Sequence, residues 1–526
     1  MQKSWRFYLF ENDNQNFCFD CFTHKIYPIS KEISDLISKS KFNQIKRKYN
    51  KFYKTVVEQK EFEAKCEREN ICRVTLNFSN KCNLNCAYCF RNKTNMKSMT
   101  NEEIDDVFDF VINKYQPDVE GYSVSLCLNS ESSLEIEKLK YIDSLVAKYE
   151  NRFFIESDFK LISADELFSK LPLKIQEKYS DSKSSLDKLN DILCNENLWE
   201  FYDYTKVDYV KSILDFSKEL SFSKRVNINR TIINSIFYQY NLWRDVKWIG
   251  LWLMTNGANV TDEFISFAKS ICLNPISVSI DGPEEIHNYA RRYGNGTGSF
   301  NDVIKGIKKL QENGFDVSAS AVMTPKYPDA EKIVDYLLSL NVKSISLGLS
   351  RGKNEICQFN KESIDILLKS IERIYKRILD ELKSCSTNTP LFDVLKNSFL
   401  VLGIKQLYFR LYRSNRCTWG KSLIIDSKGD VYHCDSTVGY KEDFQGNYKT
   451  GITKDFYYIP SVNDNKKCKK CWAKYFCGGT CHAEKVLKNQ NNIDMECYFK
   501  KELTKLGFNF YLELYKNNLL KEFCEQ

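Results

Sequence analysis

The sequence lacks a long apolar run, and its opposite charges nearly cancel. No stretch of about 18 apolar residues occurs among the 526, which excludes a membrane-spanning helix. The first residues, Met1–Arg6, contain no apolar signal-peptide core, so we expect a cytoplasmic protein without a membrane partner. The 77 basic and 69 acidic side chains are spread along the chain and leave a net charge of +8. This balance favours a solvated surface over a nucleic-acid-binding face, and it allows an acidic peptide partner.

Cysteine, by contrast, is abundant, with 20 residues. Because the cytoplasm keeps thiols reduced, clustered cysteines indicate metal or iron–sulfur sites and not disulfides. Ten of the cysteines fall into the motifs described below, and the others, such as Cys127 and Cys194, are scattered. We interpret the scattered ones as small buried apolar residues. Cys18 and Cys21 form a CxxC pair, but no second pair lies nearby, so we expect no metal there.

A short loop with three cysteines is the most informative feature. Cys82, Cys86 and Cys89 stand between a strand-like run, Cys72–Phe78, and a helix expected over Thr100–Lys114. Three thiolates at this spacing can hold three irons of a 4Fe–4S cube and leave the fourth iron without a protein ligand. A closed structural metal site uses four ligands. The loop is therefore interpreted as a cluster that binds something else; the alternatives are a zinc knuckle or a chance spacing.

Residues 1–65 are expected to form a small separate α+β domain. Short strands are expected over Arg6–Phe10, Asn16–Asp20 and Lys25–Ile29, and a helix begins after Ser30, a candidate N-cap. Such a sheet followed by helices resembles the leader-recognition domains of peptide-modifying enzymes, which add a peptide to an exposed sheet edge. The alternative is that this segment only packs against the next domain.

Strands and helices alternate from about residue 70 to 350. This alternation predicts an α/β fold with a parallel sheet and right-handed crossovers, and six units predict a partial (β/α)6 barrel. Its site is expected at the carboxyl ends of the strands, as in full barrels. The expected strands are Cys72–Phe78, Tyr122–Leu128, Ile249–Met254, Ile276–Ile280, Val317–Met323 and Ser344–Leu349, and the helices between the later strands are Asp262–Cys272, Phe300–Asn313 and Ala330–Leu340.

Two segments depart from this alternation. Residues 151–245 are mainly polar, aromatic and helical in pattern, and they form an insertion between the second and third strands. A substrate lid, a dimer surface and an inert elaboration all remain open for it. Residues 351–410 are expected to form a helical bridge, with helices over Lys361–Lys383 and Leu391–Arg410, which leads into a cysteine-rich domain over 411–526.

The three-cysteine loop resembles that of the radical S-adenosylmethionine (SAM) superfamily. The resemblance implies that the open iron of the cluster binds the amino and carboxylate groups of SAM, and that Tyr88 lies beside the adenine. Electron transfer from the cluster then splits SAM and releases a 5′-deoxyadenosyl radical. The resemblance thus implies the radical SAM form of the partial barrel.

The family's strand-end motifs match further residues of this chain. Glu131 lies in Asn-Ser-Glu-Ser where the family usually has Gly-Gly-Glu-Pro, and it would accept a hydrogen bond from the methionyl ammonium. Asn256 lies in the Thr-Asn-Gly motif of the next strand end, and Ser279 would bind the ribose or carboxylate of SAM. Arg291 or Arg292 would bind the carboxylate through a planar fork. Ordinary strand-end turns and surface salt bridges are the alternatives.

Seven cysteines near the end of the chain fit, in order and spacing, the SPASM extension of radical SAM enzymes. The resemblance implies two auxiliary 4Fe–4S clusters, and therefore three clusters in all. Residues 405–416 contain no eighth cysteine, so the inner cluster is expected to have an iron open to a substrate thiolate. A zinc ribbon is the alternative. The outer cluster would be held by Cys468, Cys471, Cys477 and Cys497, and the inner one by Cys417, Cys434 and Cys481.

Asp435 follows Cys434. A carboxylate at this position takes a proton from the oxidised residue in sulfatase-maturing relatives, and a surface or capping role is the alternative. The resemblance of residues 70–500 is to radical SAM–SPASM peptide maturases, above all those that form thioether crosslinks in Cys-rich, ribosomally made peptides (RiPPs). It implies a Cys-containing precursor peptide and a low-potential electron donor, a ferredoxin or flavodoxin, in an anaerobic host.

Formylglycine formation on a sulfatase and carbon–carbon crosslinking of a peptide are the alternatives within the enzyme class. A non-catalytic iron–sulfur or zinc protein that binds a peptide is the alternative outside it, because the Asn-Ser-Glu-Ser segment departs from the usual SAM-binding motif.

Overall fold

The computed structural model describes most of the chain outside the insertion. The described residues are 4–58, 73–90, 97–111, 123–128, 131–155, 173–180, 188, 248–271, 273, 275–384, 389–415, 417, 422–453 and 461–525. Most of the insertion expected over 151–245 therefore lies outside the described residues. Only the end of α5 (Ile136–Ile155), the short helix α7 (Leu173–Lys178) and the few residues beside α7 are described there.

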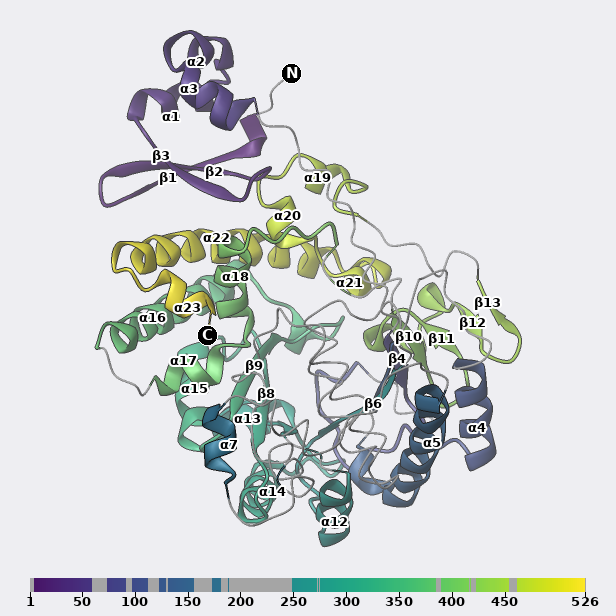
Figure 1. Cartoon of the computed structure of the whole chain (residues 1–526). Helices are drawn as coiled ribbons and strands as arrows, with labels where there is room; N and C mark the ends of the chain where they lie inside the picture. Colours follow the sequence, from purple (N-terminus) through teal and green to yellow (C-terminus); the bar gives the residue numbers. More distant parts are fainter. Residues whose placement is uncertain are drawn as a thin grey trace.

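The N-terminal residues fold as an antiparallel sheet with helices on one side (Figure 1). The strands are β1 (Phe7–Asn12), β2 (Gln15–Asp20) and β3 (Lys25–Ile29), in the order β1-β2-β3. Asp13 and Asn14 join the first two strands with φ of 48° and 60°, the left-handed conformation that a two-residue hairpin turn requires. The three strands expected from the sequence are present.

Ser30 caps helix α1 (Lys31–Ser38), as expected, because its side chain accepts a hydrogen bond from the Ile33 amide at 3.3 Å. Helices α2 (Phe42–Lys48) and α3 (Asn50–Phe52) and the turn η2 (Tyr53–Val57) complete the domain. The buried Arg6 binds Asp20 through two nitrogens, at 2.6 and 2.7 Å, and also donates to the Val56 and Val57 carbonyls. This arginine thus ties the end of η2 to the sheet.

A parallel five-stranded sheet forms the centre of the chain, in the order β5-β6-β7-β8-β9. Strand β4 lies beside β5 at one edge. The parallel α/β architecture predicted from the sequence is therefore confirmed. The strands are β4 (Arg73–Leu76), β5 (Ser123–Leu128), β6 (Trp248–Thr255), β7 (Ile276–Ser279), β8 (Val317–Met323) and β9 (Ser344–Leu349).

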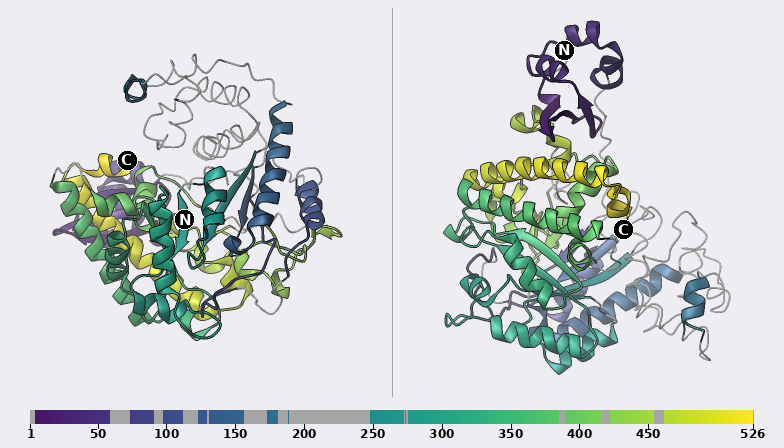
Figure 2. Two further views of the ribbon diagram at one scale, coloured as in Figure 1. Left: turned by 90° about the horizontal axis from the view of Figure 1, so that it is seen from below. Right: turned by 90° about the vertical axis from the view of Figure 1, so that its left-hand side faces the viewer.

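Helices pack on the outer face of this sheet (Figures 1 and 2). Thr100 begins the first of them with a capping box, because its side chain accepts from the Glu103 amide and Glu103 accepts from the Thr100 amide. The helices are α4 (Asn101–Asp109), α5, α12 (Asp262–Ser270), α13 (Glu284–Ala290), α14 (Phe300–Glu312) and α15 (Ala330–Ser339).

The bridge contains α16 (Lys361–Lys383), as predicted, but the single helix expected over Leu391–Arg410 is wrong. The chain forms α17 (Pro390–Leu395) and α18 (Phe399–Tyr408) instead. The residues between them, which include Ser398, leave the helical path. Apolar residues on both sides of the break are buried in one core, so the apolar pattern continues through it.

The C-terminal part does not stand apart from the barrel. Strand β10 (Ser422–Ile425) pairs in parallel with β4 and antiparallel with β11 (Val431–Tyr432), so it extends the sheet edge. Helix α22 (Gln490–Lys516) packs along α16, and its buried Phe499, Phe510 and Leu514 belong to the same core as the strands. The remaining elements are β12 (Gly446–Asn447), β13 (Gly451–Ile452), α19 (Lys466–Lys469), α20 (Lys474–Cys477), α21 (His482–Val486) and α23 (Leu520–Glu525).

The N-terminal sheet docks on the C-terminal part through aromatic side chains (Figure 2). Tyr8 stacks on Trp472 with ring centroids 4.2 Å apart, and Phe19 packs on Phe508 of α22 at 4.5 Å. Trp472 directly follows Cys471, so the small domain sits next to one of the cysteine motifs. Among the described residues, no helix combines the length and apolar character needed to cross a bilayer.

Candidate functional site

The three-cysteine loop follows β4 and is held against the segment after α13. The Asn85 amide donates to the Arg292 carbonyl at 2.6 Å, and the Ala87 amide donates to the Ala290 carbonyl at 2.8 Å. Leu84 and Tyr293 add an isolated antiparallel bridge. These backbone bonds fix the loop at the carboxyl ends of the strands, where the sequence placed it. Its thiols, Cys82, Cys86 and Cys89, are all partly exposed and form no disulfide.

Asn256, at the end of β6, reaches the first cysteine. Its Nδ2 donates to Asn83 Oδ1 at 2.7 Å and lies 3.9 Å from Cys82 Sγ, and its Oδ1 accepts from the Ala258 amide. Gly257 has φ +74°, and an added Cβ would lie 2.6 Å from Val278, so glycine is required behind this asparagine. The structure thus brings Asn256 to the cysteine loop, as the sequence predicted.

Glu131 is buried, and both of its oxygens are hydrogen-bonded. Oε1 accepts from Ser133 Oγ at 2.5 Å and from Thr255 Oγ1 at 2.7 Å, and Oε2 accepts from the Asn256 amide at 2.7 Å. Burial raises the pKa of Glu131, while these hydrogen bonds act in the opposite direction. The side chain therefore braces the turn that carries Asn256. A contact of Glu131 with a methionyl ammonium stays a prediction.

Tyr88, Asp281 and Arg291 form one cluster beside the loop, in which Asp281 and Arg291 are buried and Tyr88 is partly exposed. Asp281 Oδ2 accepts from the Tyr88 hydroxyl at 2.5 Å and from Arg291 Nε at 3.0 Å, and its Oδ1 accepts from the Val322 amide at 2.9 Å. The Arg291 guanidinium lies 5.4 Å from the centre of the Tyr88 ring. Burial raises the pKa of Tyr88 well above its usual value, so the hydroxyl keeps its proton and donates it.

The two arginines proposed as alternatives occupy different places. Arg291 is buried in this cluster, whereas Arg292 is exposed and its Nε donates to the Asn288 carbonyl at 2.6 Å. Of the two, Arg291 is the one that shares a cluster with Tyr88. Ser279, at the end of β7, is 7% exposed and pairs in register with Ser320 of β8.

His287 contacts the backbone of Asp281, the central residue of the Tyr88–Asp281–Arg291 cluster. Its Nδ1 accepts from the Asp281 amide at 3.4 Å, its Nε2 lies 3.0 Å from Ser299 Oγ, and burial lowers its pKa to about 4. The ring is therefore neutral at pH 7 and orients the Asp281 turn through a hydrogen bond.

Four of the C-terminal cysteines lie within electrostatic range of one another. Burial raises the pKa of the Cys468 thiol, the neighbouring thiols add to this, and the Lys485 ammonium opposes it. Lys501 opposes the same effect at Cys471 and Cys497. Cations beside a group of thiols favour the thiolate form that binds iron. The group consists of the cysteines predicted for the outer cluster: Cys468, Cys471, Cys477 and Cys497.

Two of the three cysteines predicted for the inner cluster, Cys434 and Cys481, also interact electrostatically, and both act on Arg351. Arg351 follows β9, and its Nη1 donates to Cys481 Sγ at 3.6 Å. Cys417 is exposed. The sequence reasoning did not identify Arg351, because a lone arginine after a strand carries no motif.

Asp435 lies near the end of β4. Its Oδ1 accepts from Asn77 Nδ2 at 3.3 Å, and Asn77 follows the last residue of β4. The Asn77 amide in turn donates to the Ile425 carbonyl of β10 at 2.8 Å. The carboxylate is therefore held at the same strand ends as the cysteine loop. Asn77 was not identified from the sequence, and no motif marks it.

The donor set of the loop fits an iron–sulfur cluster, because the cysteines around a 4Fe–4S cube each bind a separate iron through a thiolate. Soft thiolates on a tethered, partly exposed loop, Cys82, Cys86 and Cys89, provide what such a cube requires.

Comparisons with known proteins give a family match and several relatives. Residues 232–337 match the model of the radical SAM superfamily. The chain is 25% identical over 321 residues to a cysteine-type anaerobic sulfatase-maturating enzyme of Clostridium novyi, which covers 56% of this chain and 78% of that protein. It is 24% identical over 402 residues to the radical SAM cyclopropyl synthase TigE of Paramaledivibacter caminithermalis, covering 72% and 77%.

Among solved structures, native anSMEcpe with bound AdoMet superposes with a TM-score of 0.51 at 15% identity. The superposition covers 85% of this chain and 100% of that chain, and it shows a shared fold. The superfamily match over residues 232–337, the cysteine loop and this fold make the chain similar to radical SAM proteins.

Proposed function

We propose that the protein modifies a ribosomally made, Cys-containing peptide and forms thioether crosslinks in it by radical chemistry. A 4Fe–4S cluster with bound SAM would supply the 5′-deoxyadenosyl radical for removal of a hydrogen atom from a peptide carbon. Cys82, Cys86 and Cys89 would hold this cluster. Tyr88 and Arg291, which share one cluster with Asp281 beside the loop, would contact SAM.

The main support for this proposal is the position of the Asp435 carboxylate beside Asn77, at the end of β4. Asn77 holds the carboxylate at the strand ends that also carry the cysteine loop, and Cys434 directly precedes it. A base at this place can accept the proton that leaves the substrate when a new bond forms, and the partial barrel excludes water from the radical. The C-terminal cysteines would hold two further clusters, the SPASM arrangement, to receive the surplus electron.

The N-terminal domain supports a peptide substrate. Its sheet has the order β1-β2-β3, so the outer edge of β3 has no strand partner among the described residues. An extended peptide can add to such an edge. The same domain docks beside Cys471 through Tyr8 of β1 and Trp472, so a peptide captured at β3 would be held by a domain that contacts the cysteine-rich region.

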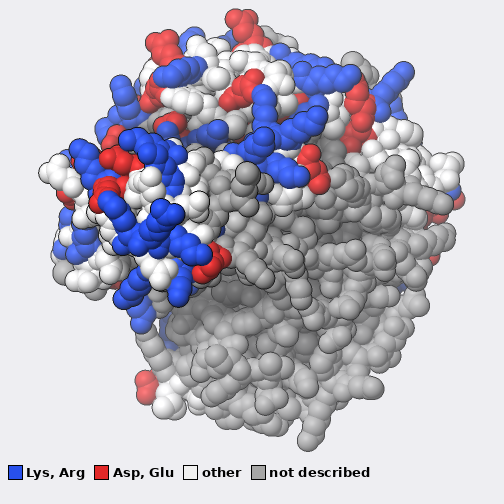
Figure 3. Space-filling view, turned by 90° about the horizontal axis from the view of Figure 1, so that it is seen from above, with Lys and Arg blue, Asp and Glu red and all other residues white. Residues whose placement is uncertain are grey.

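A basic face on the N-terminal domain suits an acidic leader segment. Lys and Arg gather on the near side of the molecule in Figure 3, with fewer Asp and Glu among them. The exposed cations around α2 and α3, which we call the basic face, are Lys39, Lys41, Lys46, Arg47 and Lys51. Like charges held together attract an opposite charge and speed its association, most strongly at low salt.

The test is anaerobic turnover of the reconstituted protein with dithionite, SAM and a synthetic Cys-containing precursor peptide. We expect 5′-deoxyadenosine together with a peptide that has lost two hydrogen atoms for each thioether. Asp435→Asn should slow formation of the modified peptide and leave SAM cleavage in place. Absence of 5′-deoxyadenosine would favour a non-catalytic peptide-binding protein.

Maturation of a sulfatase is the second candidate function. The identity to the Clostridium novyi enzyme and the fold shared with anSMEcpe favour it, and anSMEcpe has also been solved with bound AdoMet and the Kp18Cys peptide. The mass of the product separates the two reactions, because formylglycine formation removes the cysteine sulfur whereas a thioether keeps it. The similarity to TigE makes carbon–carbon bond formation a further possible outcome of the test. In that case every cysteine of the peptide product would keep a free thiol.

A further inference from the structure

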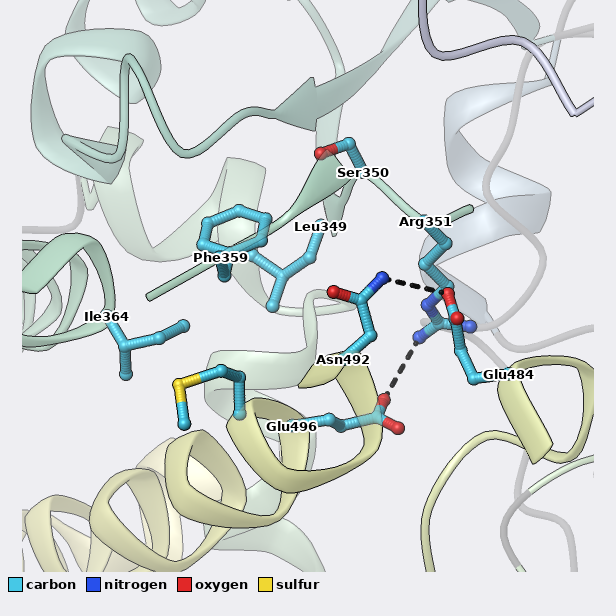
Figure 4. A pocket seen from close by; sticks show the side chains of 9 residues that line it. Leu349, Ser350, Arg351, Phe359, Ile364, Glu484, Asn492 and Glu496 are labelled. Atoms are coloured by element: carbon cyan, nitrogen blue, oxygen red, sulfur yellow. Dashed lines mark hydrogen bonds and ion pairs between the residues drawn. The ribbon is translucent and has the colours of Figure 1, made fainter. Parts of the chain in front are cut away.

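Arg351 stands where the barrel meets the C-terminal cysteines. It is the second residue after β9, and its guanidinium turns toward α21 and α22 (Figure 4). Nη1 lies 3.6 Å from Cys481 Sγ, and Nη2 lies 3.5 Å from Glu496 Oε1. The Arg351 side chain is 43% exposed and that of Glu496 is 10% exposed, so a largely buried carboxylate holds a cation that is partly open to solvent.

The Glu496 carboxylate contacts both Cys481 and Arg351. Its Oε2 accepts from the Cys481 amide at 2.8 Å while its Oε1 faces the guanidinium. One carboxylate therefore sets the position of the cysteine backbone and of the cation that approaches the cysteine sulfur. Glu496 also directly precedes Cys497 of the outer group.

The backbone that carries Arg351 is fixed from the other side. The Gly352 amide donates to Glu484 Oε1 at 3.1 Å, and the Gly352 carbonyl accepts from Asn489 at 2.9 Å and from Asn492 at 3.2 Å. Gly352 has φ +127°, which only glycine adopts readily. The segment after β9 is thus locked onto α21 and α22, so the distance from Arg351 to Cys481 is a property of the fold.

We propose that Arg351 raises the reduction potential of the inner auxiliary cluster, the cluster assigned to Cys417, Cys434 and Cys481. This inference rests on the proposed function, which places a cluster there. Uptake of one electron makes the cluster more negative and involves no bond or proton in this step. A fixed cation that donates to a ligand sulfur stabilises the more negative, reduced form. The electron from the substrate would accordingly be accepted more readily at the inner cluster.

The outer group has different cations. Lys485 acts on Cys468 and Lys501 on Cys471 and Cys497, whereas Arg351 acts on Cys434 and Cys481. Removal of one charge should therefore move the potential of one cluster more than that of the other. Lys485→Gln is the control for Arg351→Gln, because each change removes one positive charge, from α21 beside the outer group in one case and from the segment after β9 in the other.

The experiment is an EPR-monitored redox titration of the anaerobically reconstituted holoprotein, with iron and sulfide counted for each variant. For Arg351→Gln we expect the inner cluster to shift to a more negative potential, with about a tenfold change in its oxidised-to-reduced ratio at fixed potential, which is 59 mV for one electron. Arg351→Lys should restore most of this shift because it keeps the charge. Lys485→Gln should move the outer cluster and leave the inner one within error.

Three results would overturn the inference. The first is an unchanged inner potential in Arg351→Gln at full iron content. The second is an equal shift of both clusters in both variants. The third, wild-type protein that holds only the cluster of Cys82, Cys86 and Cys89, would overturn the assignment of auxiliary clusters along with it. If Arg351→Gln loses iron, the potential of Arg351→Lys decides: an inner potential close to the wild-type value supports the role of the charge, and a large negative shift at full iron content contradicts it.

Discussion

Replacement of Asp281 by asparagine tests whether the cluster of Tyr88, Asp281 and Arg291 holds the site together. Asp281 is 1% exposed and receives hydrogen bonds from Tyr88, Arg291 and Val322. The change keeps the volume but removes the negative charge and leaves the 8% exposed Arg291 without its counterion. Breaking a buried ion pair by removing one partner costs about 3–5 kcal/mol. The hydrogen bonds lost from Tyr88 and Val322 belong to the same network, so their contributions are contained in this figure and are not added to it.

The assay is urea unfolding followed by tryptophan fluorescence under reducing conditions. We expect Asp281→Asn to lower the free energy of unfolding by about 3–5 kcal/mol, with weaker SAM binding. Arg291→Met alone should also destabilise, and the double variant should lose less than the sum, with a coupling above about 1 kcal/mol. Glu137→Gln, which breaks the exposed Lys140–Glu137 pair, is the control and should have no measurable effect. Additive single changes, or a loss as small as in the control, would refute the reasoning.

Three further outcomes are expected. Cys86→Ala should abolish 5′-deoxyadenosine formation but retain the iron bound by the C-terminal cysteines, as iron analysis would show. Because burial lowers the pKa of His287 from 6.5 to about 4, the unfolded chain binds more protons between these pH values. Stability should therefore fall by up to about 3 kcal/mol as the pH drops through this window, and His287→Gln should flatten the curve. Trp472→Ala removes the ring that stacks on Tyr8, so it should speed proteolytic release of the N-terminal domain and weaken peptide binding without slowing SAM cleavage.

The strands could be predicted because their patterns are local. Val317–Met323 alternates buried and half-buried residues along its whole length and begins and ends where the sequence indicated. The break between α17 and α18 could not be predicted from the sequence. Apolar residues continue through it, and their spacing does not show that the helix changes direction. The pairing of β10 with β4 was also missed. It joins Ser422 to Arg73, and no local signal connects positions so far apart in the chain.

The sequence indicated which residues lie at the candidate site, but it did not indicate which of them form hydrogen bonds with one another. Tyr88, Asn256 and Arg291 each follow a motif, and the structure brings all three to the cysteine loop. That Asp281 joins Tyr88 to Arg291 depends on how two loops approach each other. The Glu131 carboxylate accepts hydrogen bonds from Ser133, Thr255 and the Asn256 amide. These contacts depend on the pairing of β5 with β6, which the sequence does not indicate. Asn77 and Arg351 belong to no sequence motif, and only the fold brings them into contact with Asp435 and Cys481.

The two edges of the central sheet explain why the C-terminal part belongs to the site. At the β4 edge, β10 pairs with the strand and Asn77 holds Asp435. At the β9 edge, the segment after the strand carries Arg351 to Cys481. An open parallel sheet leaves both edge strands exposed, and here residues from one C-terminal region contact both. That region therefore spans the strand ends from one side to the other. The contacts that hold Asp435 and Arg351 beside these strand ends are therefore also contacts that join the C-terminal region to the central sheet.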